Sequence, residues 1–171
     1  MKKIFIFVWL TSSILLSNDC IQANLISPTP FMGNNGEIFK LDNGVLGEVK
    51  FEYEYMYEYY PNVIICPSQN KLIINSKSLR ISIINMPTNI KNNTNKQNSS
   101  NIVETFIDGD FNGWEGNTIV KLQNGQIWQQ SSYIYYYHYS YNSKVMIIKT
   151  GSLYKMQIDG VPQSAYVIRL K

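Results

Sequence analysis

Two tyrosine-rich stretches are the strongest candidates for a functional surface. Aromatic residues occupy every second position from 51 to 59 and again from 133 to 141. Side chains two residues apart point to one face of a β-strand, so each stretch predicts a strand with an aromatic face. Two interpretations stand side by side. The rings pack in the core and across strands, as aromatic residues favour. Alternatively, at least three rings reach the surface and stack on a sugar, a peptide or a partner protein.

The second stretch supplies most of the candidate ligand contacts. Its opposite face carries Ile134, Tyr136 and His138, where the first stretch has mainly glutamates. The two tryptophans at 114 and 128 are typical core anchors, but they could also contact a ligand. The candidate ligand-binding residues are Tyr133, Tyr135, Tyr136, Tyr137, His138, Tyr139, Trp114 and Trp128.

Catalytic groups are few. Glu52, Glu54 and Glu58 share one strand face, with neighbouring carboxylates about 7 Å apart, a spacing suited to acid–base work on sugars. The alternative is a solvated face that discourages edge-to-edge pairing. His138 is the one histidine, and its neighbours are tyrosines, which leaves no Ser-His-acid arrangement. We therefore predict no catalytic residue and no enzyme activity.

A metal site has one weak candidate. Residues 108–113, Asp-Gly-Asp-Phe-Asn-Gly, match the first half of a calcium loop, with oxygen-bearing side chains at alternate positions and glycine at the sixth. The twelfth position, which should be a bidentate glutamate, is Ile119. A polar turn is the better interpretation. The sequence predicts no metal and no cofactor.

Both tyrosine stretches belong to an internal repeat. Residues 40–44 match 121–125 at an offset of 81, whereas the tyrosine runs match at 82. The 82 register keeps the aromatic faces equivalent, since a slip of one residue would move them to the opposite side. We expect a β-bulge to absorb the extra residue. Because the aromatic face is shared and the opposite face diverges, we expect the shared face to serve the fold and the divergent face to bind.

The repeat predicts an all-β fold of two tandem small β-barrels. Repeat 1 covers 36–85, a flexible Asn-rich linker covers 86–104, and repeat 2 covers 105–171; residues 24–35 look irregular. Asn43-Gly44 and Asn124-Gly125 predict type I′ hairpin turns. The expected strands are 37–41, 46–60, 62–66, 71–75 and 79–84, then 118–122, 126–141, 144–149, 154–158 and 165–170.

The N-terminus resembles an export signal. Lys2 and Lys3 precede a short apolar run, and 1–23 would be removed after Ala23. A lipoprotein signal at Cys20 is less suitable, because the residues before it are not small. Without 1–23, Cys66 is a lone cysteine and should be a buried, unreactive thiol. We expect a secreted or periplasmic protein with no integral membrane segment after signal removal.

The net charge of the chain argues against nucleic-acid partners. The formal net charge of the chain is +3, and it falls to +2 when Lys2, Lys3 and Asp19 leave with the signal. A nearly neutral chain lacks the basic footprint of a nucleic-acid-binding protein. We expect no nucleic acid among its partners.

A family resemblance rests on residues 113–130, the Tyr/His run that follows them and Lys144 to Ile147. These residues resemble SH3-like small β-barrel modules of bacterial secreted proteins of unknown function. The resemblance covers 105–171 well and 36–85 weakly, because Gly47 stands where repeat 2 has Trp128. It implies binding of peptides or cell-wall material.

Together these features predict an exported, non-catalytic binding module that recognises a protein, peptide or cell-wall glycan through its tyrosine-rich strands. The alternative is a secreted or periplasmic inhibitor or immunity-type protein that blocks an enzyme.

Overall fold

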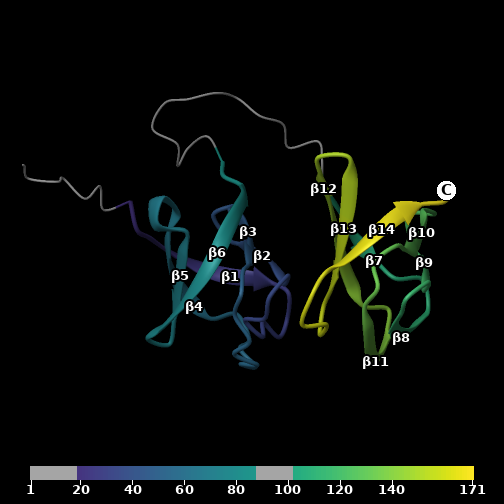
Figure 1. Cartoon of the computed structure of the whole chain (residues 1–171), viewed down its shortest axis with the longest axis horizontal. Coiled ribbons are helices and arrows are strands. Elements are labelled where there is room, and N and C mark those ends of the chain that lie inside the picture. The colour runs from purple at the N-terminus through teal and green to yellow at the C-terminus, as the bar shows by residue number, and fades with distance from the viewer. Residues whose placement is uncertain (1–18, 88–101) are drawn as a thin grey trace, which may run out of the picture.

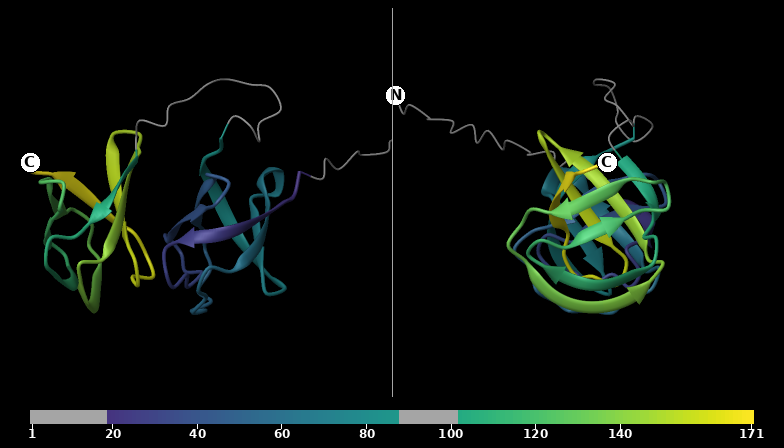
Figure 2. Two further views of the ribbon diagram at one scale, coloured as in Figure 1. Left: turned by 180° about the vertical axis from the view of Figure 1, so that it is seen from behind. Right: turned by 90° about the vertical axis from the view of Figure 1, so that its right-hand side faces the viewer.

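Strands make up nearly all the regular structure of the chain. The computed structural model describes residues 19–87 and 102–171 (Figure 1). One short 3-10 helix, η1 (Pro67–Gln69), is the only helix within these residues. The strands form two small barrels that lie next to each other along the long axis (Figure 2). The predicted all-β fold is confirmed.

The first barrel is closed. Its six strands are hydrogen-bonded in the order β1-β2-β3-β6-β5-β4. They are β1 (Ile21–Ser27), β2 (Ile38–Leu41), β3 (Leu46–Val49), β4 (Asn62–Cys66), β5 (Lys71–Ile74) and β6 (Lys77–Asn85). Alternate side chains point inward and fill it with Leu, Ile, Val and Phe, among them Leu25, Phe31 and Phe39.

The second barrel is a curled six-stranded sheet covered by a two-stranded one. The larger sheet has the order β7-β12-β13-β14-β10-β9, and β8 pairs with β11. The strands are β7 (Ile102–Phe106), β8 (Asp110–Glu115), β9 (Ile119–Lys121), β10 (Ile127–Gln130), β11 (Tyr135–Tyr141), β12 (Lys144–Thr150), β13 (Leu153–Ile158) and β14 (Ala165–Arg169). Trp114 and Trp128 lie in its core. The prediction of two small barrel modules is confirmed.

Each barrel begins earlier than its predicted repeat. β1 lies before residue 36, and β7 begins inside the predicted linker. The two strands are equivalent, because β1 pairs with β4 as β7 pairs with β12. The prolines at 28 and 30 made the lead-in look irregular, although β1 ends at Ser27, just before them. Residues 88–101 of the predicted linker lie outside the described part of the chain.

The two cysteines correct a prediction. Cys20 and Cys66 form a disulfide, so Cys66 is not the lone thiol that we expected. Strand β1 begins at Ile21, directly after Cys20. A chain cut after Ala23 would therefore lose the disulfide and the first three residues of β1. The described first barrel thus includes residues that a cut after Ala23 would remove; residues 1–18 lie outside the described structure.

The two hairpins form where the sequence predicted them, but with a different turn. Positive φ occurs at Gly44 and Gly125 and not at the asparagines before them. The Asn43 Oδ1 atom instead accepts a hydrogen bond from the N–H of Val45, at 3.1 Å. A type I′ turn needs positive φ at both central positions, so that assignment is wrong.

The extra residue of the repeat is Ser132. The N–H of Lys50 donates to the Arg80 carbonyl, and that of Ser131 donates to the Tyr166 carbonyl, at 2.9 and 2.8 Å. These bonds make Lys50 and Ser131 equivalent, so the additional residue follows Ser131. It lies in the connection between β10 and β11, and the expected β-bulge is not what absorbs it.

One cross-strand pair explains why the repeats looked dissimilar. Phe39 pairs with Gly47 in the first barrel, and Val120 pairs with Trp128 at the same place in the second. A Cβ atom on Gly47 would lie 2.4 Å from Cζ of Phe39. The large ring therefore lies on the first strand of the hairpin in one barrel (Phe39) and on the second strand in the other (Trp128). In both barrels the pair combines one large and one small residue, which keeps the core filled.

The two barrels pack against each other. Ile38 and Leu46 of the first barrel form a buried cluster with Met146 and Ile148 of the second. Nζ of Lys155 binds Oε1 of Glu48 at 2.6 Å across this junction, and both residues are buried. The contact joins the β2–β3 side of one barrel to the β12–β13 side of the other.

Candidate functional site

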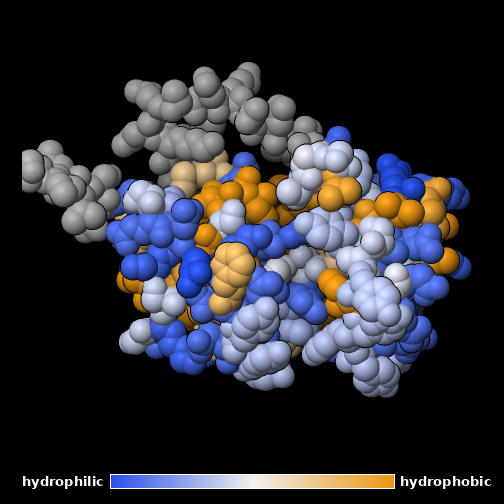
Figure 3. Space-filling model, viewed as in Figure 1, coloured by the Kyte–Doolittle hydropathy of each residue, from blue (hydrophilic) through white to orange (hydrophobic). Residues whose placement is uncertain are grey.

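Alternate residues of both tyrosine-rich segments project into solvent. Each ring is between 58% and 90% exposed. We call this surface the tyrosine face. Its members are Phe51, Tyr53, Tyr55, Tyr57, Tyr59, Tyr60, Tyr133, Tyr135, Tyr137, Tyr139 and Tyr141. Figure 3 shows pale, ring-bearing side chains along the lower edge, where the 51–60 segment and β11 lie in Figure 1.

The outward direction of these rings reverses one prediction. β11 pairs with β8 alone, and its inner side lies on the core, where Ile134 and Tyr136 pack. The odd-numbered residues must then point outward, because strand side chains alternate. The shared aromatic face is thus the exposed one, and the divergent face serves the core. The core of so small a barrel has no room for five large rings.

The first tyrosine segment is not a regular strand. The expected strand 46–60 ends at Val49, and Phe51, Tyr55 and Tyr60 have positive φ. The segment is nevertheless fixed by main-chain hydrogen bonds: Phe31 and Glu58 exchange N–H···O bonds of 2.9 and 3.0 Å. It runs beside residues 31–34 as β11 runs beside β8, so both segments occupy the same place in their barrels.

A buried carboxyl group supports the first segment from below. Glu37 is fully buried and accepts the N–H groups of Met32 and Asn34 at 3.0–3.2 Å. The Oδ1 atom of Asn34 in turn accepts the N–H of Tyr55 at 3.2 Å. Burial raises the pKa of Glu37 to about 8, although the backbone donors oppose the rise.

A neutral amide does the same work in the second barrel. Gln130 is buried, and its Oε1 atom accepts the N–H of Gly116 at 2.8 Å. Its Nε2 group donates to the carbonyls of Ser132 and Ile134, at 2.9 and 2.8 Å, where the tyrosine segment begins. One side chain therefore ties the β8–β9 loop to the start of the tyrosine segment.

Sequence reasoning missed both supporting side chains, yet each leaves a signal. Glu37 is two residues before the core residue Phe39, and Gln130 is two residues after the core residue Trp128. Residues two apart share a strand face, so each is a polar side chain in an inward position. A polar residue there needs hydrogen-bond partners and marks a structural site.

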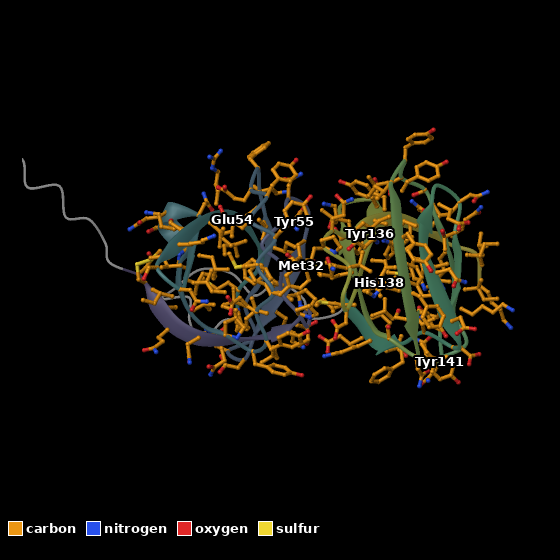
Figure 4. The ribbon with its side chains drawn as sticks, turned by 90° about the horizontal axis from the view of Figure 1, so that it is seen from below. Met32, Glu54, Tyr55, Tyr136, His138 and Tyr141 are labelled. Atoms are coloured by element: carbon orange, nitrogen blue, oxygen red, sulfur yellow. A yellow bond between two sulfur atoms is a disulfide. The ribbon has the colours of Figure 1, made fainter. Side chains whose placement is uncertain are left out.

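The two tyrosine segments meet at the junction of the barrels. Burial, and then the nearby hydroxyls of Tyr57 and Tyr55, raise the pKa of Tyr136. Figure 4 looks onto this side, and Tyr55 and Tyr136 face each other from the two barrels. The tyrosine face therefore continues from one barrel to the other.

Neighbouring groups hold several rings in place. Tyr133 and Tyr135 form an edge-to-face pair with centroids 5.3 Å apart. The Tyr139 hydroxyl donates to Oδ1 of Asp110 at 3.0 Å, and this bond raises the pKa of Tyr139. In the first segment the guanidinium of Arg80 lies 5.6 Å from the centre of the Phe51 ring. Each of these contacts favours one orientation of the ring.

The predicted ligand contacts fall into three groups. Tyr133, Tyr135, Tyr137 and Tyr139 belong to the tyrosine face. Tyr136 and His138 are half-buried beneath it, with stacked rings 6.3 Å apart. Burial lowers the pKa of His138.

The two tryptophans form the third group and correct the predicted set. Trp114 and Trp128 are 1% and 2% exposed, so they offer no surface to a ligand. Large aromatic side chains with this degree of burial anchor a core.

The glutamates of the first segment brace it. Each pairs with a side chain of β6 or of the turn before it, which holds the segment against the barrel. Glu52 pairs with Arg80, Glu54 with Lys77 and Glu58 with Asn75.

A polar hollow lies beside β8, next to the tyrosine face. It has a volume of about 660 Å³, and its lining includes Asp108, Asp110, Asn112, Glu115 and Asn117. The sequence predicted a polar turn at 108–113, but strand β8 begins at Asp110, so only the first two of these residues form the turn. Within residues 19–87 and 102–171, no group of three or more His, Cys, Asp or Glu side chains is arranged to hold a metal ion.

The chain matches no protein-family model, no curated protein and no solved structure. In the part of the chain that the structure describes, no helix has the length and apolar character needed to cross a membrane.

Proposed function

We propose that the protein is an exported, non-catalytic binding module whose tyrosine face takes up an extended ligand: a protein surface, a peptide or a cell-wall glycan. One observation carries this proposal. Eleven aromatic rings, each more than half exposed, lie along one segment of each barrel, and the two segments meet where Tyr55 faces Tyr136. Monomeric proteins rarely leave so much aromatic surface uncovered unless it binds something.

The chemistry of the face fits such ligands. A tyrosine ring offers an apolar surface for stacking, and its hydroxyl offers a polar edge. Because both segments are tied to their barrels by main-chain hydrogen bonds, the rings are already positioned before a ligand arrives. The polar hollow beside β8 adds carboxylate and amide groups at the margin for hydrogen bonds to a polar ligand.

The proposed location outside the cytoplasm follows from the N-terminal sequence and from the disulfide. Structural disulfides persist in oxidising compartments, which include the periplasm and the medium. The Cys20–Cys66 bond suits a secreted or periplasmic protein. The resemblance to SH3-like modules of bacterial secreted proteins agrees with this proposal.

Affinity capture from the cell's own envelope and culture medium tests the function. The wild-type chain should retain a specific ligand, and a Tyr135→Ser/Tyr137→Ser/Tyr139→Ser variant should lose it. A Leu153→Ser variant serves as the control, since Leu153 is 52% exposed and lies at the β12–β13 turn, away from the tyrosine face. Equal recovery by the wild type and the triple variant would remove the tyrosine face from consideration.

A further inference from the structure

The contact between the barrels joins two different surfaces. The first barrel uses its β2–β3 side, with Ile38, Leu46 and Glu48, and the second uses its β12–β13 side. Such a contact is heterologous, because the two barrels contribute different surfaces. Each barrel therefore has one surface that is equivalent to its neighbour's contact surface but takes no part in the junction. The second barrel has its own equivalent of the β2–β3 side, and the first barrel has its own equivalent of the β12–β13 side.

The unused surface of the second barrel remains apolar. Matched through the β2–β3 and β9–β10 pairings, Ile119 stands at the place of Ile38, and Ile127 at the place of Leu46. Ile38 and Leu46 are buried by the neighbouring barrel, whereas Ile119 is 57% exposed. Ile168 and Leu170, 48% and 51% exposed, lie beside them on β14 and just beyond it. We call this the open face of the second barrel; the right panel of Figure 2 looks onto this end, and Figure 3 shows apolar surface there.

The first barrel has the matching surface at the opposite end. Ile64 of β4 stands at the place of Met146, and it is 42% exposed. Its partner across the strands is Ile73, which stands at the place of Gln157. Lys71 occupies the place of Lys155. We call this the open face of the first barrel. In Figure 1 the β4–β5 and β9–β10 pairs lie at the two outer ends of the molecule.

We propose that the open face of the second barrel binds the open face of the first barrel of a second copy of this chain, head to tail, with the geometry of the internal junction. The occupant follows from the repeat itself. A barrel of the same kind already covers the equivalent surface within the chain, where Ile38 and Leu46 pack on Met146 and Ile148. Ile119, Ile127 and Ile64 stand at three of these four positions, and the disulfide-bonded Cys66 stands at the fourth.

The charges explain why the contact between copies is weaker than the internal one. Inside the chain, Glu48 pairs with the buried Lys155. Between copies, the same place brings Gln129 to Lys71, which leaves a hydrogen bond in place of an ion pair. The internal contact is also intramolecular, since both barrels belong to one chain, and such a connection supplies an effective concentration on the order of 1 mM. Association should therefore depend on protein concentration and, because the contact does not close, yield a ladder of oligomers.

Sedimentation of residues 19–171, which hold every described strand and both cysteines, tests this inference. Wild type should form dimers and larger species as the concentration approaches about 1 mM, the range set by the internal tether. Ile119→Glu and Ile64→Glu, which each spoil one open face, should both be monomeric. Mixed together, these two variants should form a 1:1 dimer and nothing larger, since each keeps the face that the other lacks.

Three controls complete the test. Gln129→Glu restores the charge that pairs with lysine and should tighten association at least about tenfold, whereas Gln129→Lys should abolish it. These substitutions at a half-exposed position leave the core untouched. Tyr137→Glu should have no effect, which separates this contact from the tyrosine face. The inference is overturned if wild type stays monomeric to about 1 mM, if Tyr137→Glu alone abolishes association, or if the mixed variants fail to pair.

Discussion

The two barrels present the same exterior over different interiors. Both expose a row of alternating aromatic rings at the same place in the fold. Beneath that row, the first barrel buries a titratable carboxyl group, Glu37, and the second a neutral amide, Gln130. The first barrel also has a disulfide and a Phe–Gly core pair, and the second has a Val–Trp pair instead. The aromatic surface therefore does not depend on one particular core, and the predictions below separate what each barrel relies on.

Loss of the large core ring should have the largest effect. Trp128→Gly leaves a cavity in the second barrel, and such truncations typically destabilise a protein by about 3–5 kcal/mol. If the core pairs are interchangeable, adding Val120→Phe should recover much of this loss, since it recreates the Phe39–Gly47 pair. Urea unfolding followed by the fluorescence of Trp114 measures both variants. A double variant no more stable than Trp128→Gly would show that the pairs are not equivalent.

Removal of the disulfide should weaken the first barrel alone. Cys20 and Cys66 are 46 residues apart, and a crosslink closing such a loop contributes about 2–4 kcal/mol. Cys20→Ser/Cys66→Ser should therefore speed amide hydrogen exchange in β1 and β4, next to the bond. The second barrel serves as the internal reference, because its strands contain no cysteine. Equal acceleration in β12 and β13 would mean that the barrels unfold as one unit.

The buried carboxyl group should make the first barrel sensitive to pH. The pKa of Glu37 rises from 4.5 to about 8 on folding, so the folded state holds a proton that the unfolded state has lost between these values. Stability from this group is fully present below pH 4.5 and falls as the pH rises toward 8, by at most about 1.4 kcal/mol per pH unit. The urea midpoint of wild type should drop relative to that of Glu37→Gln over this range. Parallel pH profiles would contradict the assignment.

The smallest effect concerns the surface itself. Tyr139→Phe removes the hydroxyl that binds Asp110 and keeps the exposed ring. Because the bond lies at the surface, the unfolding midpoint should not change measurably. A clear loss of stability in Tyr139→Phe would show that the exposed tyrosines stabilise the fold. The two barrels would then no longer differ only in their cores beneath a shared aromatic surface.

Much of the fold could be predicted from the sequence. The repeat and the Asn-Gly turns placed most strands, because alternation and tight turns are local signals. β1, β7 and β8 were missed, because Pro28 and Pro30 follow the first, an Asn-rich run precedes the second, and residues 108–113 resemble a polar turn. The disulfide was missed because the expected cut after Ala23 removed Cys20. Such pairings depend on contacts distant in sequence, which local patterns do not carry.

The sequence located the tyrosine rows of the candidate site but not the face of each strand that is exposed. The tyrosine rows were visible, but which face points outward depends on what covers the strand. Alternation alone cannot distinguish the two faces when one carries tyrosines and the other carries Tyr136 and His138. The supports at Glu37 and Gln130 were identifiable in principle as polar residues in inward positions. The junction between barrels had no sequence signal, since Ile38 and Leu46 look like ordinary strand residues until a neighbour covers them.

Hydroxyl-radical footprinting of the tyrosines tests the central claim most directly. The purified chain is oxidised alone and then with a solubilised envelope fraction, and each tyrosine is quantified by mass spectrometry. We predict protection of rings from both segments, Tyr55 and Tyr57 as well as Tyr135 and Tyr137, with Leu153 unchanged as the exposed reference. Protection elsewhere on the molecule with these tyrosines still fully reactive would contradict the account.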